Sequence, residues 1–290
     1  MYKIKTSHFV KQNSVECSFG NSESWVILNP IELSIKKKIE KVGVPLKDWD
    51  IKIYRGILTG CNEAFIISEE RRNEILQWCN DESEKQRTVE LIRPILRGRD
   101  IKRYGYSFAN LYLIASHNGI PDKNIPRINI EDYPAVKRHL DQYWDKISKR
   151  ADMGDTPYNL RSCAYMDDFS KQKIVWGNLG LTAGFAQAPE NMYVNAPCPM
   201  ITPFNKYLLI VLNSKLGDWY IRQLGVTRNG GYFEYKPMFV SQLPVPMLST
   251  SEQFVIVSKA TESQTEDERE QIILNLYGLS EEEQCFILTH

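Results

Sequence analysis

The sequence lacks the signals of several common protein classes. No apolar run among its 290 residues approaches the ~20 residues that span a bilayer, and the segment from Met1 to Lys5 lacks the apolar stretch of a signal peptide. The six cysteines are far apart and form no C-x-x-C pair, so zinc or redox chemistry is not indicated. We therefore expect a cytoplasmic protein with reduced cysteines and no membrane contact.

Catalytic motifs are missing as well. The sequence contains no G-x-x-x-x-G-K-[ST] loop, no G-x-G-x-x-G after a strand and no G-x-S-x-G elbow. The aspartate pairs Asp152/Asp155 and Asp167/Asp168 could hold a metal ion, but loop aspartates more often cap turns. The sequence therefore predicts no catalytic, cofactor-binding or metal site in this chain.

The sequence also has no net charge, since 36 basic residues balance 36 acidic ones. This balance at first argues against a nucleic-acid-binding protein, whose affinity usually comes from lysine and arginine. The charges are unevenly distributed, however, because residues 262–284 hold eight acids and one base and carry −7, which leaves +7 for the remainder. We expect a basic body that can meet phosphates and an acidic tail that faces away from DNA.

Apolar residues at helical spacing predict amphipathic helices in three places. One begins at Asn29-Pro30 and continues through Ile39, and one begins at Pro134 and continues through Ile147. The third carries Leu208 to Trp219 and ends at Gly225. Extended patterns predict strands at residues 51–58, 64–67, 111–115, 173–176 and 198–202.

Strands and helices do not alternate regularly, so the fold class predicted is α+β, with small mixed sheets and packed amphipathic helices. We predict one domain over residues 1–250, which can divide into two lobes near residue 127. Residues 251–290 should form a separate acidic helical segment, because Thr265 with Glu268 and Ser280 with Glu283 match the capping box.

The densest functional signal is a cationic stretch over residues 92–104. Five bases there accompany a single acid, Asp100, and give a local charge of +4. Guanidinium groups bind phosphate and guanine edges through paired hydrogen bonds, so the stretch fits a nucleic-acid contact. A solvated charged turn fits the same residues. The bases are Arg93, Arg97, Arg99, Lys102 and Arg103.

Polar residues in three loops are further candidates for DNA contact. Their amides, hydroxyls, aromatic rings and guanidinium groups suit base edges or phosphates, although each loop taken alone also fits an ordinary turn. Gly230-Gly231 marks one of these loops as tight. The candidates are Arg55, Thr59, Asn62, Tyr158, Arg161, Arg228 and Asn229.

Eight sequence blocks occur together in one order from about Trp25 to Gln284. With them, the chain resembles the TaqI-like C-terminal specificity domain of type IIG restriction enzymes and adenine-N6 DNA methyltransferases. The tail, with LNLYGLSEEEQ, is similar to the usual end of those polypeptides. The blocks are GILTGCNEAFII, RPILRGRDIKRY, YPAVKRHL, KRADMGDTPYNLRSCAY, KIVWGNL, LLIVLNSKLGDWY, NGGYFEY and QLPVP.

The resemblance implies a target-recognition domain that grips double-stranded DNA opposite a catalytic half. It places Thr59, Asn62, the 97–103 stretch, Arg161 and residues 228–231 along the DNA face. The methyltransferase and nuclease domains, with S-adenosylmethionine and Mg²⁺, would belong to the rest of the polypeptide or to a partner chain. This chain has neither the Asn-Pro-Pro-Tyr-type motif nor the glycine-rich cofactor motif of the methyltransferases.

Two other classes of function remain open. The chain could be a metal-dependent nuclease that uses scattered acids, namely Asp152, Asp155, Asp167 and Glu234. It could instead be a protein–protein module in which helices rich in tyrosine and tryptophan bind a partner.

Overall fold

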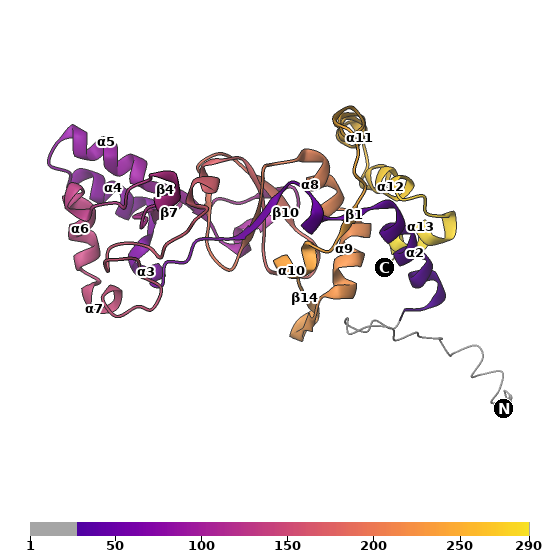
Figure 1. Cartoon of the computed structure of the whole chain (residues 1–290), viewed down its shortest axis with the longest axis horizontal. Coiled ribbons are helices and arrows are strands. Elements are labelled where there is room, and N and C mark those ends of the chain that lie inside the picture. The colour runs from indigo at the N-terminus through magenta and orange to yellow at the C-terminus, as the bar shows by residue number, and fades with distance from the viewer. Residues whose placement is uncertain (1–27, 290) are drawn as a thin grey trace.

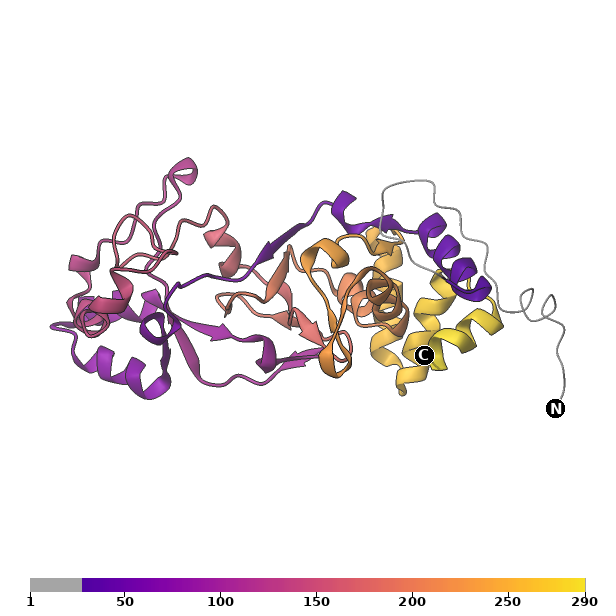
Figure 2. The same cartoon turned by 90° about the horizontal axis from the view of Figure 1, so that it is seen from below.

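The computed structural model describes residues 28–289, so the segment from Met1 to Lys5 and Trp25 lie outside the described residues. The chain is elongated, with α3–α7 at one end and α2 with α11–α13 at the other (Figure 1). Seen from below, extended segments of chain join the two ends (Figure 2). The structure confirms the predicted α+β class.

The described residues form helices and strands with the following bounds. The helices are α2 Pro30–Val42, α3 Asn62–Phe65, α4 Glu69–Gln77, α5 Glu82–Leu91, α6 Pro134–Asp141, α7 Trp144–Ile147, α8 Lys206–Leu212, α9 Lys215–Leu224, α10 Pro237–Val240, α11 Thr250–Glu262, α12 Glu266–Leu276 and α13 Glu281–Thr289. The strands are β1 Val44–Pro45, β2 Lys52–Arg55, β3 Ile66–Ser68, β4 Ile92–Leu96, β5 Ile101–Lys102, β6 Gly105–Tyr106, β7 Leu111–Ile114, β8 Lys173–Trp176, β9 Leu179–Gly180, β10 Phe185–Ala188, β11 Tyr193–Val194, β12 Pro199–Thr202, β13 Thr227–Arg228, β14 Tyr232–Glu234 and β15 Pro244–Val245.

The strands form several small sheets. The central sheet has the order β10-β8-β12-β2 and is antiparallel throughout. A second four-stranded sheet, β11-β4-β7-β3, contains one parallel pair, β11 with β4. The order β13-β14-β9 forms a three-stranded sheet, and the pairs β5-β6 and β1-β15 complete the set.

The central sheet separates two hydrophobic cores. On β8, Val175 belongs to the first core whereas Ile174 and Trp176 belong to the second. On β12, Met200 and Ile201 divide between the cores in the same way. Successive side chains of a strand point to opposite faces, so both faces of this sheet are buried, one in each core.

The first core lies between the central sheet and α3–α7. The second core lies between that sheet and the helices α2 and α8–α13. The tail belongs to the second core, where Ile273, Leu274, Tyr277 and Ile287 are buried beside Ile39 of α2. Residues 57–147 and residues 160–200 both contribute to the first core, and the expected boundary near residue 127 lies inside the first of these ranges. The acidic segment is thus packed into the body rather than appended to it.

Two of the three predicted helices are each broken into two. The helix from Pro134 ends at Asp141 and a short helix follows, which leaves Trp144 45% exposed instead of in the core. The other break lies at Asn213, whose side chain bonds to the backbone N–H and C=O of Phe185 at 3.0 and 2.9 Å. Ser214 then caps α9 by accepting a hydrogen bond from the Gly217 backbone at 3.0 Å. Side-chain-to-backbone bonds of this kind compete with a continuous helix.

The strand predicted over residues 64–67 is wrong in its first half. Residues Asn62–Phe65 form one helical turn, α3, which buries Ala64 and Phe65 in the first core. Only Ile66–Ser68 is extended, and it pairs with β7. A short apolar run does not distinguish a buried strand from a buried helical turn.

Lys173 is a buried base in the central sheet and allows a pH test of the fold. Its Nζ donates hydrogen bonds to the Pro189 and Met192 carbonyls at 3.2 and 3.0 Å. Burial lowers the pKa of Lys173 from 10.5 to about 8, so above this value the unfolded chain binds more protons than the folded one. The stability of the wild type should therefore rise with pH in this window.

We predict that the unfolding free energy of the wild type minus that of Lys173→Met increases by about 1 kcal/mol from about pH 7 to about pH 9. Urea titrations at both pH values measure it. The variant is the control, because methionine does not titrate while all other groups are unchanged. A difference that stays constant or shrinks would contradict the assignment.

Candidate nucleic-acid interface

The basic loop, defined as residues 97–103, is organised around Asp100. Arg97 donates two side-chain hydrogen bonds to the Asp100 carboxylate at 2.9 and 2.8 Å, and its backbone N–H donates a third at 2.8 Å. Burial raises the pKa of Asp100, but the bonds from Arg97 outweigh it and hold that pKa below its usual value. Arg97 therefore shapes the loop and is not a free cation.

Arg103 connects the basic loop to the tail. Its Nε donates to the Asn213 carbonyl at 3.0 Å, its Nη2 pairs with Glu270 at 2.7 Å, and its Nη1 pairs with Glu266. Burial raises the pKa of Glu270, although the Lys215 backbone N–H and Arg103 oppose that shift. The acidic tail was expected to face away from DNA and Arg103 to face it, but the structure joins the two in one ion-pair network.

We predict that Arg103→Ala lowers the free energy of unfolding by about 2 kcal/mol, because it leaves the buried Glu270 carboxylate without its charged partner. Urea denaturation measures the loss. The double variant Arg103→Met/Glu270→Met removes both charges and should recover part of the stability. Additive losses in the double variant would show that the pair is not coupled.

Arg99 and Lys102 are the exposed cations of the basic loop. Neither forms an ion pair with any residue of the range 28–289. Arg99 lies in the 3-10 turn Gly98–Asp100, and Lys102 lies on β5. Of the cations predicted in this loop, these two are the ones free to meet phosphate.

A second segment, residues 177–184, lies directly beside the basic loop, and the sequence analysis did not identify it. A Cβ on Gly98 would lie 3.7 Å from the Gly177 Cα, and a Cβ on Gly184 would lie 3.6 Å from the Arg103 backbone nitrogen. We call this stretch the bridging segment. The sequence does contain one signal for this approach, namely glycine at position 98 of the basic loop and at positions 177 and 184 of the bridging segment. Glycine permits close approach of two backbones.

The predicted loop at Arg228 and Asn229 lies on the other side of the bridging segment. Its strands pair with each other and with β9, so Phe233 lies opposite Gly180. Gly230 and Gly231 have φ of +80° and +78°, a conformation that favours glycine. The Arg228 Nε donates to Glu234 at 2.6 Å, yet its side chain remains 55% exposed. The basic loop, the bridging segment and this hairpin thus form one contiguous surface.

The remaining candidates lie in the part of the protein that surrounds the first core, which we call the first lobe. The Thr59 side chain is only 2% exposed and its hydroxyl donates to the Asn62 side-chain oxygen at 2.6 Å. Thr59 therefore holds its own turn, and the expected contact of its hydroxyl with a base edge is not available in this conformation. Asn62 is exposed. Arg55, at the end of β2, is exposed beside Tyr165.

Tyr158 and Arg161 have partners within the same lobe. The Tyr158 hydroxyl donates to Asp141 at 2.6 Å, and burial together with Asp141 raises the pKa of Tyr158 to about 12. Arg161 pairs with Asp152 at 2.9 Å and is 53% exposed. Both side chains reach the surface, so these contacts could be exchanged for contacts with DNA.

Arg150, which the sequence analysis missed, holds this part of the first lobe together. It is 7% exposed, and its guanidinium donates to the carbonyls of Thr59, Asp152, Pro157 and Asn159. Burial lowers its pKa to about 10. One guanidinium therefore fixes the turn at residue 59 against the loop at residues 152–159.

The acids proposed for a nuclease are not gathered into a metal site. No cluster of three or more His, Cys, Asp or Glu side chains suited to a metal ion occurs within residues 28–289. Asp152 pairs with Arg161, Asp167 with Lys123 at 2.6 Å, and Glu234 with Arg228.

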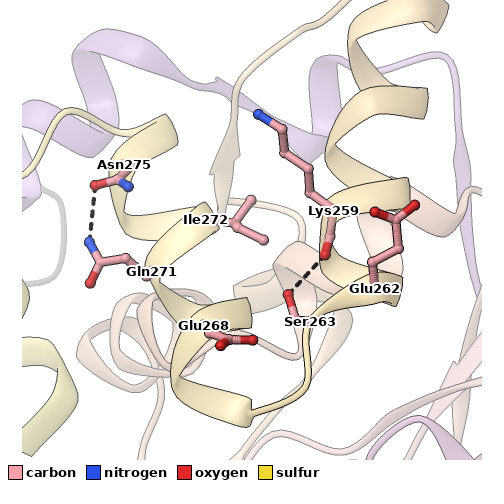
Figure 3. Close-up of a pocket in the computed structure, with 7 residues that line it drawn as sticks. All are labelled: Lys259, Glu262, Ser263, Glu268, Gln271, Ile272 and Asn275. Carbon is pink, nitrogen blue, oxygen red and sulfur yellow. Dashed lines mark hydrogen bonds between the residues drawn. The ribbon is translucent and has the colours of Figure 1, made fainter.

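A shallow hollow lies between α11 and α12 (Figure 3). The residues that line it include Lys259, Glu262 and Glu268. No described helix is long and apolar enough to cross a membrane.

Comparisons with known proteins address the family and the fold. Residues 93–245, more than half of the chain, match the family described as the TaqI-like C-terminal specificity domain. The chain is similar to the type IIL restriction-modification enzyme MmeI, solved in complex with DNA, with a TM-score of 0.57 and 11% identity, over 85% of this chain and 36% of that chain. It is also similar to the type IIG restriction endonuclease BpuSI, with a TM-score of 0.52 and 11% identity, over 89% of this chain and 31% of that chain. The chain therefore spans about a third of these two solved chains, and no curated protein matches it.

Proposed function

This chain belongs to the TaqI-like C-terminal specificity domain family, and from this premise we propose that it recognises a specific sequence in double-stranded DNA. Electrostatic capture by phosphate contacts would come first, and hydrogen bonds to base edges would then fix the domain at one site. The similarity to a restriction-modification enzyme solved with DNA supports the proposal.

The observation that carries the proposal is the contiguous surface of the basic loop, the bridging segment and the Arg228 hairpin. Arg99 and Lys102 contribute two exposed cations with no described acidic partner. Arg228 and Asn229 lie on the far side of the bridging segment, beside two glycines with positive φ. Cations that position the backbone and polar groups in a tight loop are the two kinds of contact that a DNA-reading surface needs.

We propose that catalysis is carried out by other domains. Methyltransferase and nuclease domains would act with this chain, either within a longer polypeptide or as a partner chain, and S-adenosylmethionine and Mg²⁺ would be their cofactors. The chain's span of about a third of its solved relatives leaves room for such domains. In such an assembly the target adenine would be flipped out of the duplex, and this domain would brace the distorted DNA.

Titration of a random fluorescent duplex by the 290-residue chain at two salt concentrations tests the proposal. We expect affinity that falls steeply as salt rises, because bound phosphates release counterions. Selection from a randomised duplex library should then enrich one short sequence. A folded chain that binds no duplex at low salt, or that binds but enriches nothing, would overturn sequence-specific recognition.

A protein-docking role is the second candidate function. On α11, Phe254 and Val255 are 71% and 48% exposed, and Met247 before that helix is 59% exposed. Exposed apolar clusters are typical of protein interaction sites. This role would be favoured if the chain bound a catalytic domain with an affinity that does not depend on salt, and did not bind DNA.

A further inference from the structure

The sheet formed by β9, β13 and β14, which we call the tip sheet, has an inner face packed on the protein. The Arg222 guanidinium of α9 lies over the Phe233 ring at 4.3 Å. The Tyr235 hydroxyl donates to Asp218, and the Trp176 indole donates to the Tyr235 carbonyl at 2.7 Å. In Figure 1, β14 lies at the end of a projection beside α9 and α10, on the side of the molecule opposite α11.

The outer face of the tip sheet carries large exposed side chains beside the Arg228–Glu234 ion pair. Leu179 lies opposite Glu234 across the pair β9-β14, and Tyr232 is two residues from Glu234, so Leu179 and Tyr232 share a face. Leu181 continues this face, since its Cδ2 is 4.0 Å from the position of a Cβ on Gly231. The exposed fractions are 56% for Leu179, 56% for Leu181 and 44% for Tyr232. Three large side chains are therefore exposed to solvent, close together, at the end of a projection.

The bridging segment that carries these leucines is held in place by α9. Arg222 donates to the Leu181 carbonyl at 2.5 Å, and the Ala183 N–H donates to Asp218 at 3.1 Å. Arg222 and Asp218 also pair with each other at 2.8 Å. The backbone at Leu181 and Ala183 is thus held by α9, so this backbone loses little conformational entropy on binding.

The charges around the outer face favour a polyanion. The one acid on this face, Glu234, pairs with both Arg228 and Lys236, at 2.5 and 2.7 Å. Their side chains are 55% and 41% exposed, so two cations outweigh one buried carboxylate. Lys102 of the basic loop is exposed, and its carbonyl carbon would lie 3.8 Å from a Cβ on Gly184 at the end of the bridging segment.

We propose that Leu179 and Leu181 of the tip sheet enter a groove of duplex DNA and partly unstack one base step. The proposal rests on the proposed function and adds the way in which the surface engages DNA. Phosphates and groove edges are polar, whereas the faces of the bases are the large apolar surfaces of a duplex. Apolar side chains that sit among phosphate-binding cations gain most by reaching those faces, as leucine wedges do in proteins that deform DNA.

The test uses closed circular plasmid DNA, because it does not require the recognised sequence. The plasmid is relaxed by a topoisomerase in the presence of saturating protein, freed of protein, and its topoisomers are resolved. An unstacked step unwinds the duplex, so the wild-type chain should leave the plasmid negatively supercoiled. The variant Leu179→Ala/Leu181→Ala should lose this shift at a protein concentration at which a separate titration shows that the variant saturates the plasmid.

The variant Phe254→Ala/Val255→Ala is the matched control, because it also shortens two exposed apolar side chains, on α11. It should keep both binding and the topological shift. Wild-type protein that binds the plasmid but leaves the topoisomers unchanged would overturn the insertion and leave DNA recognition standing. A leucine variant that still shifts the topoisomers would overturn the insertion as well, and a wild-type chain that binds no DNA would overturn both proposals.

Discussion

Replacing Arg150 by alanine is expected to lower the free energy of unfolding by about 3 kcal/mol or more, the largest single stability effect that we predict. The guanidinium donates to four carbonyls in two segments, at residue 59 and at residues 152–159. Its removal leaves buried acceptors without donors and also removes its packing against the Phe65 ring, 4.4 Å away. A hydrogen bond to a charged group contributes about 1.5–3 kcal/mol, and a buried acceptor without a donor costs about 1–3 kcal/mol. Urea unfolding followed by circular dichroism measures the change.

Two variants separate this effect from the loss of a positive charge. Arg150→Lys keeps the charge but lacks the forked donors, so it should recover only a small part of the stability. Arg161→Ala removes an arginine from the same lobe whose side chain is 53% exposed and pairs with Asp152, and this change should cost less than about 1 kcal/mol. Equal losses for Arg150→Ala and Arg161→Ala would refute the role assigned to the buried guanidinium.

DNA binding should respond most strongly to the two free cations of the basic loop. We predict that Arg99→Ala/Lys102→Ala reduces the slope of log affinity against log salt by about 2, since each phosphate contact contributes about 0.9. At about 50 mM salt this corresponds to a loss of affinity of roughly a hundredfold. Anisotropy titrations of a random duplex at several salt concentrations measure both quantities.

The control for this prediction removes the same charge from another surface. Lys37 and Lys41 are exposed on α2, at the end of the molecule that carries the tail (Figure 1). Lys37→Ala/Lys41→Ala should leave the salt slope nearly unchanged. Similar losses in both double variants would mean that binding follows net charge and that the basic loop has no special place in it.

Much of the local structure could be predicted from the sequence, because caps and hydrophobic periodicity are local signals. The helix at Asn29-Pro30 and the tail helix capped by Thr265 are confirmed. The break at Asn213 could not be predicted, since it depends on bonds to Phe185, a residue distant in sequence. The helix α11 lies in the segment predicted to be helical, but its start was not assigned although Ser249 and Glu252 form its capping box.

The sequence predicted which residue types the candidate site contains, but not how these residues are arranged. The sequence identifies the cations of the basic loop, but their partners come from elsewhere. Asp100 binds Arg97 within the loop, while Glu266 and Glu270 reach Arg103 from the tail. The bridging segment has no charged residue to draw attention to it, and only the fold places it between the two predicted patches. That these residues contact DNA stays a prediction.

The central sheet that both cores share determines how the specificity of this protein can be redesigned. Val175 and Trp176 are neighbours on one strand but belong to opposite cores. A lobe transplanted from a relative would therefore be matched to only one face of the central sheet. Whole-lobe exchange should therefore yield chimeras with a mismatched interior. Within the loops at residues 97–103, 177–184 and 228–231, the exposed positions can be replaced while the scaffold is kept, together with Arg97, Asp100 and Arg103.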